Sequence, residues 1–230
     1  MPGELGPVVA SGRDGDIYEY GPGLVLRRTR DGRVIEHEAR AIAYAEEHGY
    51  PVPHVHDVLA GGTEIVMERL DGPMMMDVMI RKPWTISHHA NLLADLHDRL
   101  HEIPAPAWLP RLDGEGDRLL HLDLHPMNVM LTSRGPVVID WTNAAAGDSL
   151  TDIGLTYVLM TSATAPMPRA VNALVSPVRR WMTNLFVRRY RGPELSEHIA
   201  RAAELKMLDP NMSAVEVELL RRVVVRMRGT

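Results

Sequence analysis

One stretch of the chain gathers residues that can act as a base and as metal ligands. His121, Asp123 and Asn128 lie in His-Leu-Asp-Leu-His-Pro-Met-Asn, and Asp140 follows in Val-Val-Ile-Asp-Trp. An Asp carboxylate can orient and deprotonate a hydroxyl nucleophile, whereas Asn and Asp supply oxygen ligands that suit Mg²⁺. These residue types predict a site where one carboxylate acts on a hydroxyl and two oxygen donors hold a divalent cation.

Two short apolar runs separate the two metal-ligand candidates. Residues 129–131 and 137–139 each favour a strand, and Ser-Arg-Gly-Pro at 133–136 indicates a turn between them. A strand–turn–strand unit brings its two ends together. The sequence therefore predicts that Asn128 and Asp140 meet at one end of a hairpin.

The spacing His-x-Asp-x-x-x-x-Asn is typical of a kinase catalytic loop, whose Asp is the base and whose Asn reaches a metal. The alternative for a single His-x-Asp is an ordinary turn with a hydrogen-bonded Asp. The complete set, with an apolar strand that ends in Asp140-Trp141, favours phosphoryl transfer from a magnesium-bound nucleotide.

Composition narrows the remaining classes. The chain has 230 residues, a net charge of −5 and no cysteine. This length suits one domain or two small lobes, and the mild charge does not indicate a nucleic-acid partner. The lack of cysteine excludes disulfides and thiolate chemistry. No signal peptide and no apolar run of about 18–20 residues is visible, so we expect a cytoplasmic protein without a membrane partner.

The patterns along the chain predict an α+β fold. Residues 1–70 favour a small antiparallel sheet with one helix: strands near 7–10, 17–20, 24–28, 55–59 and 64–68, and a helix over 34–48 that ends at Gly49. Residues 71–230 favour a mainly helical lobe, with helices near 87–102, 149–162, 178–190, 194–207 and 213–228.

With these elements in order, the sequence resembles the aminoglycoside phosphotransferase family, small-molecule kinases with the protein-kinase fold that include choline-kinase-like members. The resemblance is carried by His121–Asn128 and Val137–Trp141, and residues 66–72 look like the interlobe hinge. It implies a bilobal protein-kinase-like fold, ATP or GTP as donor, Mg²⁺ as cofactor and a small hydroxyl-bearing substrate. A homo-oligomer is compatible with it.

The resemblance also implies roles for the residues of the catalytic loop. Asp123 matches the catalytic base, and Asn128 and Asp140 match the Mg²⁺ ligands. His121 is expected to brace the loop. His125 occupies a position near the γ-phosphate, where it either stabilises developing charge or serves the structure alone.

In the N-terminal lobe, Arg27 stands where the family's kinase fold has a strand lysine that clamps the α- and β-phosphates. A guanidinium can fork onto phosphate oxygens, although it departs from the lysine pattern. Glu38 lies on the helical face that would meet Arg27. A shift of the strand register by one residue would move every side chain of the strand to the opposite face. Arg28 would then be the alternative clamp.

The remaining nucleotide contacts are less specific. Gly12 and Gly15 match a phosphate-binding glycine loop or, equally, an ordinary hairpin turn. Val25 is expected against the adenine, and Glu68 and Leu70 are expected to bind it through their backbone groups.

The acceptor side favours a small molecule over a protein. Asp140 is followed by Trp141 instead of Phe-Gly, and no long activation segment follows. Only residues 103–120 bridge the long helix and the catalytic loop, which makes a compact substrate lobe. Acidic residues there are candidates for a cationic acceptor or are simply solvated: Asp113, Glu115 and Asp117.

Three further patterns have structural interpretations. Asp148 and Asp152 are expected to cap and anchor the helix that follows them, and contact with the substrate is the alternative. His97 and His101 have the i, i+4 spacing of metal ligands, but no third ligand is evident. The arginines of the last helices suit solvated amphipathic faces better than nucleic acid. The competing function from another class is a nucleotide-binding protein without turnover.

Overall fold

The computed structural model describes residues 5–12, 15–112, 116–162, 169–190, 192–209 and 212–229. Its internal contacts form two compact units. The first unit comprises Met1–Met74 and Asn128–Ala144, and the second comprises Met75–Met127 and Ala145–Thr230. The hairpin after the catalytic loop therefore groups with the N-terminal strands, although the sequence division at residue 70 assigned it to the C-terminal lobe.

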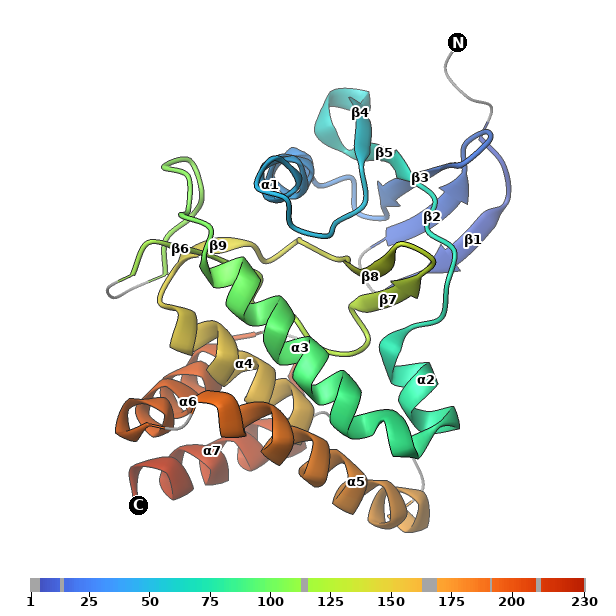
Figure 1. Ribbon diagram of the computed structural model, residues 1–230. Helices are drawn as coiled ribbons and strands as arrows, with labels where there is room; N and C mark the ends of the chain where they lie inside the picture. Colours follow the sequence, from blue (N-terminus) through green and yellow to red (C-terminus); the bar gives the residue numbers. More distant parts are fainter. Residues whose placement is uncertain are drawn as a thin grey trace. The chain divides into compact units, whose positions relative to one another are not determined.

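The first unit is built on one antiparallel sheet (Figure 1). The strands run in the order β1-β2-β3-β5-β4, and α1 follows β3 along the chain. A separate hairpin is formed by β7 and β8. The bounds are β1 Val8–Ser11, β2 Gly15–Glu19, β3 Leu24–Thr29, α1 Glu36–Glu47, β4 Val55–Leu59, β5 Glu64–Glu68, β7 Val129–Thr132 and β8 Gly135–Val138, with a 3₁₀ turn at Ala60–Gly62.

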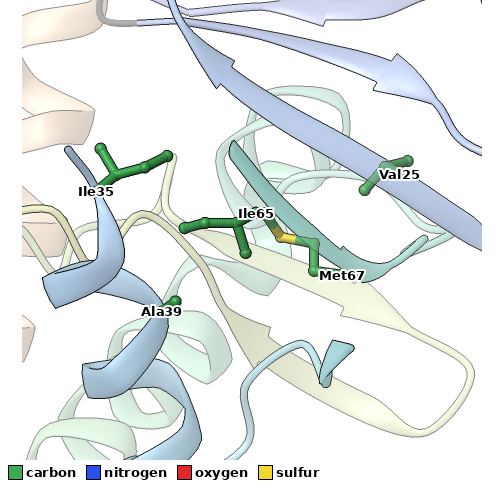
Figure 2. Packing of buried hydrophobic residues seen from close by; sticks show 5 residues of the cluster. All are labelled: Val25, Ile35, Ala39, Ile65 and Met67. Atoms are coloured by element: carbon green, nitrogen blue, oxygen red, sulfur yellow. The ribbon is translucent and has the colours of Figure 1, made fainter. Parts of the chain in front are cut away.

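The core of this unit joins one face of the sheet to α1, and Figure 2 shows its five buried residues: Val25, Ile35, Ala39, Ile65 and Met67. Alternate residues of β3 and β5 point to opposite faces, as a strand's period of two requires. The other face therefore packs separately, around Tyr20, Leu26 and Val66. Apolar residues on both faces of β3 fix its register, and the register decides which arginine faces α1.

The segment after α1 ties the hairpin to this unit. Gly49 adopts a left-handed backbone with φ 73°, which ends the helix as predicted. The Val138 N–H then donates to the Pro51 carbonyl oxygen at 2.8 Å, and Tyr50 meets the buried Trp141 edge to face. These contacts fix the end of β8, two residues before Asp140.

The second unit is mainly helical, with one short two-stranded sheet of β6 and β9 (Figure 1). Its long helix α3 buries Leu93, Leu96 and Leu100, which recur at helical spacing. The bounds are α2 Met75–Arg81, α3 Ile86–His101, β6 Arg118–Leu120, β9 Ala145–Gly147, α4 Ser149–Ser162, α5 Arg169–Val187, α6 Pro193–Lys206 and α7 Ala214–Arg228, with 3₁₀ turns at Pro83–Thr85 and Arg188–Tyr190.

The predicted helix over 178–190 is wrong in its bounds. The helix starts at Arg169, continues through Pro177 and ends at Val187. Proline ordinarily breaks a helix because it lacks an N–H and crowds the preceding turn, so the sequence pattern misplaces this start. The short elements α2, β6 and β9 were not predicted.

None of the helices in the described part of the chain is long and apolar enough to cross a lipid bilayer.

The core of the first unit predicts one clear stability difference. Ile65 is fully buried beneath α1, so Ile65→Ala leaves a cavity and should lower the free energy of unfolding by about 2–5 kcal/mol. Ile80 is 68 % exposed, so Ile80→Ala should change it by less than about 0.5 kcal/mol. Chemical denaturation followed by circular dichroism measures both, and equal losses would contradict this account of the core.

Candidate active site

Arg27 and Glu38 form a buried ion pair within the first unit. The Arg27 guanidinium on β3 contacts the Glu38 carboxylate on α1, and their side chains are only 11 % and 3 % exposed. Arg28 points the other way, where its Nε lies 2.6 Å from Glu64 Oε1. The predicted pairing is confirmed, and the alternative register with Arg28 facing α1 is wrong.

The environment of Glu38 changes its proton affinity. Burial raises the pKa of the Glu38 carboxyl to about 7, although the adjacent Arg27 charge and a Thr142 hydrogen bond act in the opposite direction. The nearby negative charge of Asp140 contributes to this rise. The charge of this carboxylate therefore depends on the cations and donors gathered around it.

Thr142 connects the ion pair to Asp140, and sequence analysis missed it. Arg27 Nη2 donates to Thr142 Oγ1 at 3.1 Å. The same hydroxyl lies 3.1 Å from Glu38 Oε2 and 2.9 Å from Asp140 Oδ1. Its single proton can bond only one of these carboxylates at a time. A hydroxyl two residues after the metal-ligand Asp was the available signal, but threonine is too common for that signal to be specific.

Asn128 and Asp140 stand at the same end of the β7–β8 hairpin. The Ile139 N–H, directly after β8, donates at 3.0 Å to the carbonyl oxygen of Asn128, directly before β7. Asp140 adopts a left-handed backbone with φ 66°, and its side chain is 46 % exposed. Arg27 Nη1 lies 3.7 Å from Asp140 Oδ1. The predicted meeting of the two hairpin ends is confirmed at the backbone, where the Asn128 residue itself is buried and the Asp140 carboxylate is accessible. Carboxylate and amide oxygens are ligands that suit a hard cation such as Mg²⁺.

Asp123 and His125 belong to the second unit. The Asp123 N–H donates to Nδ1 of the buried His121 at 3.2 Å, and Leu122 between them adopts φ 62°. His121 thus braces the backbone of the loop. His125 Nε2 lies 3.6 Å from Asp123 Oδ1, and both side chains are about one fifth to one quarter exposed (21 % and 24 %). The Asp123 carboxylate is accessible to a substrate.

The Asp152 carboxylate binds the backbone of the catalytic loop. Its carboxylate is completely buried and accepts from the His121 N–H at 3.2 Å, the Leu122 N–H at 2.8 Å and His101 Nε2 at 3.0 Å. Burial opposes the charge, but the His101 hydrogen bond and the nearby histidines hold the pKa of Asp152 well below its ordinary value. Asp152 therefore anchors the loop rather than its own helix. Asp148 caps that helix instead, through Leu150 N–H at 2.7 Å.

The His97–His101 pair does have a third potential ligand, which corrects the sequence expectation. Potential ligand atoms of His97, His101 and Asp152 lie within 4.8 Å of one another. Burial lowers the pKa of His97 to about 3, so its ring is neutral. Both Asp152 oxygens already accept backbone N–H groups, and this arrangement explains the cluster as a brace for the loop.

Gly12 and Gly15 flank the turn between β1 and β2. Gly12 donates its N–H to the Gly15 carbonyl oxygen at 2.9 Å, which closes the turn between β1 and β2. A Cβ on Gly15 would lie 2.4 Å from the Arg28 carbonyl oxygen. Close packing of β2 against β3 therefore accounts for Gly15 without a phosphate. Gly12 has no such neighbour, and residues 13 and 14 lie outside the described residues.

The predicted hinge groups are partly committed to the fold. The Glu68 N–H donates to the His54 carbonyl oxygen at 2.8 Å, so of its two backbone groups the carbonyl oxygen is the one that suits a nucleotide. The Glu68 carboxylate accepts from Arg134 Nη2 at 2.6 Å. Leu70 is half-buried, and Val25 lies in the buried cluster of Figure 2 on the same face of β3 as Arg27.

Gly72 belongs to the same hinge. It has φ 156°, and a Cβ there would lie 2.2 Å from the Leu131 carbonyl oxygen. Glycine at this position allows the chain after the hinge to pass directly against β7.

Comparison with known proteins agrees with these observations. The profile of the phosphotransferase enzyme family, APH, matches residues 81–185, which include the catalytic loop and the metal-ligand strand. The predicted resemblance is confirmed. The match also confirms the predicted class of enzyme, a phosphotransferase. A comparison with curated protein sequences finds no match.

Solved structures show the fold. A thermostable mutant of aminoglycoside phosphotransferase APH(4)-Ia, in ternary complex with AMP-PNP and hygromycin B, aligns with a TM-score of 0.68 at 14 % identity, over 99 % of this chain and 93 % of that chain. A choline/ethanolamine kinase family protein from Mesorhizobium loti aligns with a TM-score of 0.61 at 14 % identity, over 99 % of this chain and 87 % of that chain. Amicoumacin kinase hAmiN, in complex with AMP-PNP, Ca²⁺ and Ami, aligns with a TM-score of 0.56 at 13 % identity, over 98 % of this chain and 88 % of that chain. The predicted α+β, protein-kinase-like fold is confirmed.

The raised pKa of Glu38 predicts a pH-dependent stability. The folded state binds a proton that the unfolded state releases between about pH 4.5 and 7, so this contribution is fully present below pH 4.5 and is lost as pH rises toward 7. The free energy of unfolding of the wild type, relative to Glu38→Gln, should fall by roughly 3 kcal/mol across that range. Denaturant titrations at several pH values measure it, with the exposed Glu36→Gln as control. A difference that does not change with pH would show that Glu38 stays ionised.

The Thr142 contacts predict a second effect. Thr142→Val keeps the shape but removes the hydroxyl between three charged groups, so Asp140 loses a partner that fixes its orientation. Binding of Mg²⁺–ATP, measured by calorimetry, should weaken by about tenfold. Thr142→Ser keeps the hydroxyl and should bind within about twofold of the wild type. A serine variant as weak as the valine variant would assign Thr142 to packing alone.

Proposed function

We propose that this small-molecule kinase transfers the γ-phosphoryl group of ATP or GTP to a hydroxyl of its substrate with Mg²⁺. The observation that carries the proposal is the charged network of the first unit. Arg27, Glu38, Asp140 and Thr142 come from a strand, a helix and a hairpin end, and they meet around one accessible carboxylate. Such a network is costly to bury, and a nucleotide–metal site gives a reason for it.

The site residues of the first unit would bind the metal ion and the phosphates of the nucleotide. Asn128 and Asp140 would hold Mg²⁺, which neutralises charge on the phosphates when bound. Arg27 would clamp the α- and β-phosphates, with Glu38 fixing its guanidinium. Catalysis of this kind consists mainly of positioning and electrostatic stabilisation, so the rigidity of Arg27 matters as much as its charge.

Asp123 would orient the acceptor hydroxyl and take its proton. The covalent chain limits the separation of Asp123 from Asn128, because five residues span at most about 18 Å. Asp152 and His121 hold the backbone on which Asp123 is presented. His125 would face the transferred phosphoryl group, since its ring lies next to the Asp123 carboxylate.

The nucleotide base would lie against Val25, with the Glu68 carbonyl oxygen and the Leu70 N–H as partners. Gly12 remains the candidate for close approach to a phosphate. Gly15 contributes instead through the tight pairing of β2 with β3.

The acceptor is proposed to be a small molecule with a free hydroxyl. The similar structures hold hygromycin B in one case and Ami in another, which supports an acceptor of this general kind. Among the candidate acidic residues, Asp113 and Glu115 lie outside the described residues. Asp117 is 76 % exposed and lies 3.3 Å from Arg118 Nε, which favours a solvated carboxylate.

A nucleotide-binding protein without turnover is the second candidate. It is favoured by arginine in place of the clamp lysine and by a glycine loop whose Gly15 has a packing explanation. The complete set of Asp123, Asn128 and Asp140 favours catalysis, because a protein that only binds nucleotide has no use for the base.

Asp123→Asn separates the two candidates. It removes the proton acceptor and keeps the metal ligands, so acceptor-stimulated turnover should fall by about 10²–10⁴-fold while Mg²⁺–ATP affinity is retained. The assay measures ADP and GDP release with a panel of aminoglycosides, amino sugars, choline-like alcohols and nucleosides. Asp31→Asn changes an exposed carboxylate and serves as the control.

Loss of nucleotide affinity in the Asp123→Asn variant would show that Asp123 has a structural role rather than a catalytic one. Nucleotide binding by the wild type without turnover on any acceptor would support the binding protein instead. No binding of ATP or GTP at all would contradict both candidates.

A further inference from the structure

The second unit contains a cavity that the proposed reaction does not use. It has a volume of about 350 Å³ and is lined by residues of α4, α5 and α7. Helix α4 packs against both α5 and α7 (Figure 1). Small-molecule sites have volumes of roughly 300–1,000 Å³, so the cavity can take a small ligand. None of its lining residues is among those assigned to the nucleotide, the metal or the catalytic base.

The lining is strongly cationic. Arg179 and Arg180 from α5 face the same cavity as Arg222 and Arg226 from α7. The described lining residues include no carboxylate, and the others are apolar or carry hydroxyl and amide groups. Guanidinium groups that share one concavity repel one another, so this arrangement raises the free energy of the empty cavity.

The contacts of Arg226 and Arg222 leave most of their positive charge uncompensated. Arg226 donates to the Tyr157 hydroxyl, a neutral partner on the cavity wall. Arg222 Nε donates to Glu218 Oε1 at 3.1 Å, but these side chains are 72 % and 51 % exposed, so water weakens that pair. The spread of the four guanidiniums over two helices makes a concave site rather than one solvated helix face.

We propose that this cavity binds a small anion that carries at least two phosphoryl groups. Guanidinium forks match phosphate oxygens in pairs, so four of them suit more than one phosphoryl group. Tyr157 and Asn184 add neutral hydrogen-bonding groups to the wall. The site is separate from the nucleotide half-site of the first unit, and its occupation needs no Mg²⁺.

Inorganic pyrophosphate is the probe, titrated calorimetrically into the 230-residue chain in EDTA at low salt. The double variant Arg180→Gln/Arg226→Gln should bind it at least about tenfold more weakly. The control is Arg221→Gln, an exposed arginine beside Arg222 that does not line the cavity and should leave the affinity unchanged. If the double variant does not fold, Arg180→Gln alone, at an exposed position of α5, provides the same comparison with a smaller loss.

Three results would overturn the proposal. Pyrophosphate that does not bind the wild type at millimolar concentration leaves the cavity without its ligand. Equal affinity in the wild type and the variants places the anion elsewhere. Tighter binding of a short single-stranded oligonucleotide, lost in the same variants, would assign the arginines to a nucleic-acid surface.

Discussion

The charge of one buried carboxylate governs the nucleotide half of this protein. Glu38 is nearly inaccessible, so its negative charge is stable there only while Arg27 and Thr142 stay in contact with it. Those contacts require β3 to present Arg27 toward α1, and the two apolar faces of the sheet fix that register. Packing of the sheet and electrostatics of the site therefore depend on each other: a shift of one residue would bury Arg28 and expose Arg27.

In the second unit, a buried carboxylate is stabilised mainly by hydrogen bonds. Asp152 is also buried and charged, but it is satisfied by backbone N–H groups of the catalytic loop and by His101. These bonds favour the ionised form of Asp152 strongly enough to outweigh burial, whereas burial prevails at Glu38 and raises its pKa to about 7. The contrast makes Asp152 a permanent brace and Glu38 a group that responds to its neighbours.

Sequence reasoning predicted the parts of this structure that follow from local patterns. The hairpin that joins Asn128 to Asp140, the antiparallel sheet and the Arg27–Glu38 pair all rest on strand alternation, helical spacing or turn residues. It missed contacts that depend on tertiary distance. Thr142 and Asp152 meet partners more than thirty residues away, and no period in the sequence marks such meetings. Gly15 was ambiguous for the same reason, since only the approach of Arg28 distinguishes a packing glycine from a phosphate-binding one.

The use of arginine at position 27 follows from the geometry around it. A lysine ammonium is a compact point charge, whereas a guanidinium directs donors in a fixed plane. Here Nη1 reaches Glu38 and approaches Asp140, while Nη2 reaches Thr142, so one rigid group engages three partners from α1 and the end of β8. A lysine would satisfy the nearest of them and leave the others to water. The guanidinium thus holds the helix and the hairpin end together, and the departure from the lysine pattern is consistent with Arg27 serving both structure and phosphate binding.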